Sequence, residues 1–71
     1  MDFKKATDEL LATFSHEELA AALGVSVPTV RQARLDPSAK ARRSPPEGWQ
    51  RKVRRLAEQR AERLQRLAQR L

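Results

Sequence analysis

Residues 16–35, which read HEELAAALGVSVPTVRQARL, limit the possible folds more than any other part of the chain. Ser15 stands three residues before Glu18, which is the spacing of a capping box at the start of a helix. Gly24 follows an apolar, alanine-rich stretch, at the position where a residue with positive φ commonly ends a helix. Ser26, with a proline two residues later, is typical of the start of another helix. The pattern predicts two short helices joined by a turn of about four residues.

The segments on either side of this stretch also have apolar residues at helical spacing, and no segment alternates like a strand. Before it, Phe3, Leu10 and Phe14 indicate a first helix with Asp2 as its N-cap. After it, Asp36 stands directly before a proline, which ends the third helix near residue 35. We therefore expect an all-α fold, in which a three-helix helix-turn-helix core is followed by a fourth helix.

The fourth helix is expected to be the longest element of the fold. It should begin within residues 44–47 and reach Leu71, with its apolar residues on one face. Three short helices cannot cover that length, so the second half should leave an exposed apolar patch, which marks an interaction surface. Pairing with the same helix of a second copy is the simplest way to cover the patch. The predicted dimer interface comprises Ala61, Leu64, Leu67, Ala68 and Leu71.

Two residues of this helix have competing interpretations. Trp49 is the only tryptophan, and in a domain this small we favour a place in the core or an interface over a stacking role. Arg60 is the one charged residue on the apolar face. It either fixes the helix register from a buried position or extends to water, and we favour the second interpretation.

The chain has 71 residues and no cysteine, which limits its sources of stability. A single domain of this size buries only about 60% of its unfolded surface, and no disulfide or thiolate-bound metal can add to that. We expect one domain over residues 1–71, with a core in 1–35, a basic loop in 36–46 and the long helix in 47–71. Dimerisation should supply the missing stability.

Basic side chains are concentrated in the middle of the chain. Residues 25–55 carry nine basic and two acidic side chains, whereas residues 1–24 carry two basic and five acidic ones. The net charge of +6 predicts an anionic partner such as nucleic acid or a membrane surface. No apolar run is long enough to span a membrane, no aromatic row would anchor the chain on one, and no signal peptide is visible. We therefore expect a cytoplasmic, nucleoid-associated protein.

Residues 15–35 resemble the helix-turn-helix superfamily of bacterial and phage regulators, especially small repressors of the lambda Cro and phage 434 type. The small Ala20, the glycine turn and the apolar positions around it carry the resemblance, which is looser over the first helix and after residue 35. The resemblance implies that the helix beginning near Val27 lies in the major groove of double-stranded DNA.

Helix geometry divides this third helix into two faces, with Val30 and Ala33 on the inner one. Arg31 can bind guanine and Gln32 can bind adenine, each through two hydrogen bonds. The predicted base contacts on the outer face are Val27, Pro28, Arg31, Gln32 and Leu35. Helix starts and basic loops typically contact phosphates. The predicted phosphate contacts are Ser15, His16, Ser26, Thr29, Arg34, Lys40, Arg42 and Arg43.

These features predict a transcriptional regulator, in the first instance a repressor, that reads an inverted repeat as a homodimer. Two alternatives stay open: an excisionase-like architectural protein that bends DNA, and a protein-interaction module such as an antitoxin or adaptor. An enzyme is not expected, because the chain has one histidine and no cysteine and is too short for a conventional pocket. No metal, cofactor or small-molecule ligand is expected.

Overall fold

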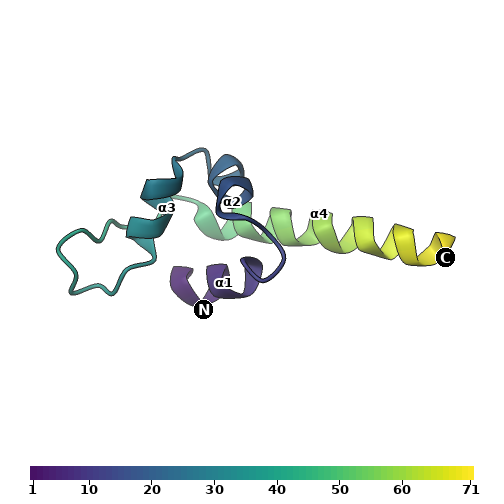
Figure 1. The fold of residues 1–71 in the computed structure, drawn as a ribbon, viewed down its shortest axis with the longest axis horizontal. Coiled ribbons are helices and arrows are strands. Elements are labelled where there is room, and N and C mark those ends of the chain that lie inside the picture. The colour runs from purple at the N-terminus through teal and green to yellow at the C-terminus, as the bar shows by residue number, and fades with distance from the viewer.

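The computed structural model describes all 71 residues and contains four α-helices and no strand. The helices are α1 (Phe3–Leu10), α2 (His16–Leu23), α3 (Val27–Ala33) and α4 (Trp49–Arg70). We call α1–α3 the head and residues 61–71 the tail. The head lies beside the first half of α4, whereas the tail projects away from it (Figure 1). The expected all-α fold with a long last helix is confirmed.

Local capping interactions set the starts of the first three helices. The Asp2 carboxylate accepts a hydrogen bond of 2.8 Å from the backbone N–H three residues on. Ser15 and Glu18 form a complete capping box, with both hydrogen bonds at 3.0 Å. The Ser26 hydroxyl accepts a bond of 3.2 Å from the backbone N–H of Thr29, in the first turn of α3. Gly24 ends α2 at φ 72°, in the left-handed region that disfavours a side chain. These features were all expected from the sequence.

Three helix boundaries differ from the expected ones. α1 ends at Leu10, and the following turn carries Phe14 into the core instead of one longer helix. α3 ends at Ala33, two residues earlier than expected. α4 begins at Trp49 rather than within residues 44–47, because Gly48 has a φ of 74° and is therefore not helical.

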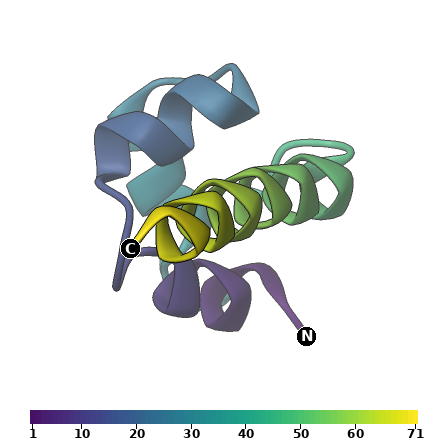
Figure 2. The same cartoon turned by 90° about the vertical axis from the view of Figure 1, so that its right-hand side faces the viewer.

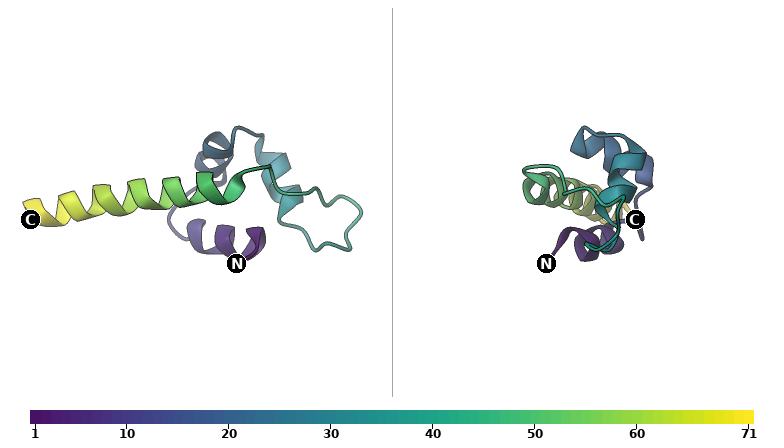
Figure 3. Two further views of the ribbon diagram at one scale, coloured as in Figure 1. Left: turned by 180° about the vertical axis from the view of Figure 1, so that it is seen from behind. Right: turned by 90° about the vertical axis from the view of Figure 1, so that its left-hand side faces the viewer.

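The core lies where the head meets the first half of α4. α4 passes between α1 on one side and the α2–α3 pair on the other (Figures 2 and 3). Trp49, Val53 and Leu56 of α4 pack against the core, and the Trp49 indole meets the Phe3 ring edge-on at 5.2 Å between centroids. Trp49, expected in the core or an interface, is half-buried and packs against the edge of the core. The buried apolar residues are Phe3, Leu10, Phe14, Leu19, Ala20, Leu23, Val30 and Ala33.

The tail has no neighbour within the chain that covers its apolar face. The side chains of Leu64, Leu67 and Leu71 are 53%, 44% and 97% exposed. All five residues of the predicted dimer interface are therefore available to a partner. None of the four helices combines the length and the apolar character that crossing a membrane requires.

Candidate nucleic-acid interface

α3 lies toward the end of the molecule opposite the tail, and the loop of residues 36–46 extends beyond it (Figures 1 and 3). Val30 and Ala33 are 0% and 3% exposed, so the inner face of α3 is held in the core. Arg31 is exposed on the outer face and makes no ion pair, and Gln32 is half-buried beside it. The expected division of α3 into two faces is confirmed.

The other residues proposed to contact bases differ in how far their side chains are exposed. Pro28 is exposed at the start of α3, and Leu35 is 40% exposed just after its end. Val27 is half-buried because it packs against the core, so only part of its side chain is exposed. Arg31 is thus the most accessible polar group on the outer face of α3.

The loop after α3 returns to that helix and is joined to it through the backbone. The Arg43 N–H donates a hydrogen bond of 3.2 Å to the Gln32 carbonyl, which places Arg43 beside the C-terminal end of α3. Lys40 and Arg43 are exposed, whereas Arg42 is half-buried and its Nε has no hydrogen-bond partner. We call α3 and the loop together the basic end of the molecule.

The start of the loop is a turn built on Asp36. The Ser38 hydroxyl and the Ser38 N–H donate hydrogen bonds of 2.6 and 2.9 Å to the Asp36 carboxylate. These bonds, the one from the hydroxyl first, lower the pKa of Asp36 below its usual value. The carboxylate thus organises the turn from which the basic residues follow.

We expected Arg34 to contact phosphate, but its side chain is bonded to α1 within the chain. Its Nε donates a hydrogen bond of 2.9 Å to the hydroxyl of the fully buried Thr7, and its terminal nitrogen pairs with the Asp8 carboxylate. Lys4 pairs with the same carboxylate at 3.0 Å, and the bonds from Lys4 and then Arg34 lower the pKa of Asp8. Arg34 therefore joins α3 to α1, and we drop it from the proposed phosphate contacts.

The helix starts provide two unequal sites for an anion. Ser15 and His16 begin α2, but Glu17 and Glu18 occupy the first turn of that helix and repel a phosphate. The first turn of α3 contains no acidic residue. There the hydroxyls of Ser26 and Thr29 lie 2.8 Å apart and are both near the helix start. This arrangement favours the start of α3 over the start of α2 as a phosphate contact.

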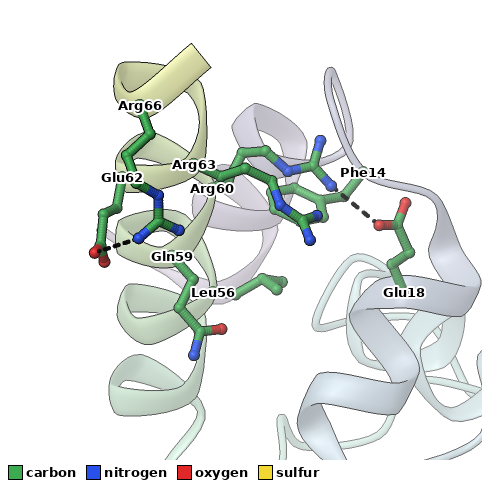
Figure 4. Close-up of a pocket in the computed structure, with 8 residues that line it drawn as sticks. All are labelled: Phe14, Glu18, Leu56, Gln59, Arg60, Glu62, Arg63 and Arg66. Atoms are coloured by element: carbon green, nitrogen blue, oxygen red, sulfur yellow. Dashed lines mark hydrogen bonds and ion pairs between the residues drawn. The ribbon is translucent and has the colours of Figure 1, made fainter. Parts of the chain in front are cut away.

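Arg60 reaches water only in part: its side chain is 28% exposed, and its guanidinium is also held at the surface of the head. Its guanidinium carbon lies 4.0 Å from the centroid of the Phe14 ring, and its two terminal nitrogens donate to the Thr13 carbonyl at 3.2 Å and to the Glu18 carboxylate at 3.1 Å. Figure 4 shows the guanidinium between the ring and the carboxylate. The Ser15 N–H, followed by the Ser15 hydroxyl and Arg60, lowers the pKa of Glu18. Arg60 thus fastens α4 to the head.

The chain shows no metal centre: no group of three or more histidine, aspartate or glutamate side chains gathers anywhere in it. Comparison with protein families, with curated proteins and with solved structures finds no match. The function must therefore be inferred from the geometry and charge of the basic end and from the uncovered tail.

Proposed function

We propose that this chain binds double-stranded DNA as a homodimer, reads an inverted repeat with α3 in the major groove, and regulates transcription as a repressor. The observation that carries the proposal is the orientation of α3. Val30 and Ala33 hold one face in the core, so Arg31 is presented outward on a short, rigid element at the end of the molecule.

The side chains on this face have the chemistry that base recognition requires. An arginine can donate two hydrogen bonds to the O6 and N7 of guanine, and a glutamine can form a matching pair with adenine. Arg31 is unpaired within the chain, so no internal ion pair must break before it contacts a base. Each such bidentate contact discriminates between bases by about 1–3 kcal/mol.

The basic loop supplies the groups that would hold α3 against the DNA backbone. Because the Arg43 N–H is bonded to the Gln32 carbonyl, the loop and α3 approach a duplex together. Lys40 and Arg43 are exposed there and can neutralise phosphates, which positions a protein on DNA without reading its sequence. Binding by such contacts should weaken steeply as the salt concentration rises.

Repression would follow from occupancy of a promoter by the bound dimer. A homodimer presents two copies of α3 and doubles the contacts that one small module can make. The site of action of such a protein is the nucleoid.

Selection of sites from a pool of random duplexes tests this proposal directly. The purified chain should enrich an inverted repeat, and Arg31→Ala should weaken binding to that repeat by roughly 5- to 150-fold, as expected for one lost bidentate contact. Arg70→Ala removes the same charge from an exposed site in the tail and should change the affinity far less.

Three results would contradict or redirect the proposal. Absence of any enriched sequence argues against sequence-specific binding. Equal weakening by Arg31→Ala and Arg70→Ala would mean that only total charge matters. A sharp bend in bound DNA without an enriched sequence would favour an architectural protein.

A further inference from the structure

The first two turns of α4 carry a dense group of basic side chains at the surface of the molecule. Residues 48–57 contain three arginines and one lysine and no acidic residue, and all four basic side chains are exposed. Helical spacing places the three arginines next to one another, on the side of α4 opposite the apolar residues that pack against the core. We call these residues the arginine cluster, which comprises Arg51, Arg54 and Arg55.

The charge of the arginine cluster has no counterpart within the chain. The four ion pairs of the structure involve other residues, and the nearest acidic residues in the sequence, Glu47 and Glu58, pair with none of the three arginines. Arg34 and Arg60, by contrast, are both bound to carboxylates of the head. Like charges three and four residues apart destabilise a helix. The arginine cluster therefore opposes the formation of α4, and an anionic partner would relieve this repulsion.

Contacts of the start of α4 place it close to both ends of α3. The Lys52 Nζ donates a hydrogen bond of 3.4 Å to the Leu23 carbonyl, which directly precedes the turn into α3. Near the other end of α3, Trp49 lines the same cleft as Ala33 and Leu35. The start of α4 and α3 accordingly lie at the same end of the molecule, whereas the tail lies at the opposite end (Figures 1 and 3). The arginine cluster is thus near the basic end.

The charge density of the arginine cluster matches that of a nucleic-acid backbone. Its three guanidinium groups project from about 6 Å of helix axis, at 1.5 Å per residue. Double-stranded DNA carries one negative charge per roughly 1.7 Å of its own axis, and the planar guanidinium group forms paired hydrogen bonds with phosphate oxygens. A membrane surface fits less well, because no apolar side chain shares this face of α4 within residues 48–57.

We propose that the arginine cluster is a second phosphate-binding surface, which contacts the backbone of the duplex that α3 reads. The inference rests on the proposed function and extends the DNA interface beyond α3 and the loop. The two backbones that border a major groove lie about 12 Å apart, so cationic side chains on an element near α3 can reach the backbone on that side. Such a contact adds affinity but reads no sequence, because phosphates are the same along any duplex.

Replacing the whole arginine cluster with glutamine tests the inference. The triple variant loses three positive charges but keeps long side chains that favour a helix. Fluorescence anisotropy then measures its binding to the enriched inverted repeat and to an unrelated duplex of the same length, between about 50 and 200 mM salt. Each lost phosphate contact should reduce the salt slope of log K by about 0.9, so two or three lost contacts lower the salt sensitivity over this range by roughly 10- to 40-fold. The enriched sequence should stay the same.

The tail supplies a matched control, because it also contains three exposed arginines. Their replacement with glutamine removes the same charge far from the basic end, so the salt slope should change by less than one phosphate contact. The substituted control residues are Arg63, Arg66 and Arg70. The arginine-cluster variant should also melt at or above the temperature of the natural chain, since the repulsion within α4 is gone. A lower melting temperature would assign these arginines to the fold and overturn the inference.

The remaining outcomes separate this inference from the DNA proposal. An unchanged salt slope in the arginine-cluster variant, or an equal change in the tail variant, would overturn the inference and leave the DNA proposal intact. Loss of a second bound duplex in the arginine-cluster variant would assign the cluster to another duplex and overturn the shared interface. Binding that depends on the cluster but enriches no sequence would refute only the reading of bases by α3. A natural chain that binds neither duplex at about 50 mM salt would refute both.

Discussion

The head and the tail both contain leucines and arginines. The two regions differ in how far the leucines are buried and in what the arginines bind. In the head, Leu19 and Leu23 are at most 2% exposed, and Arg34 is bound to a carboxylate and a hydroxyl of α1. In the tail, Leu64 and Leu67 are about half exposed, and the one ion pair joins Arg66 to Glu62 of the same helix. The comparison shows that apolar side chains are buried only where α4 has neighbours within the chain, and that those of the tail are left exposed.

The strongest test of this difference is to replace one leucine with alanine in each region. Leu19→Ala should lower the free energy of unfolding by about 2–5 kcal/mol, because it opens a cavity in a fully buried site. Leu67→Ala should change the stability of the dilute chain by less than about 0.5 kcal/mol, since its side chain lies at the surface. Urea denaturation followed by circular dichroism measures both. Similar losses for the two variants would mean that the tail is packed within one chain.

A second test compares two arginines of α4 that differ in their contacts. Arg60 stacks on Phe14 and pairs with Glu18 of the head, whereas Arg66 pairs with Glu62 one turn away. Arg60→Ala should cost about 1 kcal/mol through loss of the cation–π contact, and Arg66→Ala should cost about 0.5 kcal/mol or less. Thermal unfolding monitored at low protein concentration distinguishes them. An equal effect of both substitutions would argue against Arg60 as the link between α4 and the head.

The smallest expected effect is a dependence of stability on acid pH that arises in the head. The pKa of Asp8 and that of Glu18 are lowered from the usual 3.8 and 4.5 by the hydrogen bonds and cations beside them. A group with a lowered pKa stabilises the fold above its unfolded pKa and ceases to do so as the pH falls through its folded pKa. The melting temperature should therefore decline as the pH falls below about 4.5.

Glu18→Gln serves as the matched variant for this measurement. It keeps the shape of the side chain but cannot titrate, so its melting temperature should decline less steeply than that of the unchanged chain between pH 5 and 3. Parallel curves for the two proteins would show that Glu18 contributes nothing to the acid transition.

Most of the head could be predicted because its structure follows local rules. The capping residues Asp2, Ser15 and Ser26 each bond to backbone a few residues on, so their roles are visible in a short window of sequence. Helical periodicity likewise predicted that Val30 would be buried and Arg31 exposed. The candidate site on α3 was recognisable for this reason, although its binding to DNA stays a prediction.

The features that could not be predicted join residues far apart in the chain. Arg34 and Asp8 are 26 positions apart, and Arg60 and Glu18 are 42 positions apart. A charge pattern shows that these side chains exist but not which of them will meet. Arg34 therefore looked like a phosphate contact and Arg60 like a solvated residue, until packing brought each to a carboxylate.

The amino-acid sequence by itself determined the helical fold, the turn at Gly24 and the orientation of α3, because caps, glycine φ and apolar spacing act between residues that are close in the chain. Only the tertiary structure decided which arginines are used inside the fold and which stay unpaired at its surface. Both depend on where α4 lies against the head, and that position results from the sum of many distant contacts rather than from any local pattern.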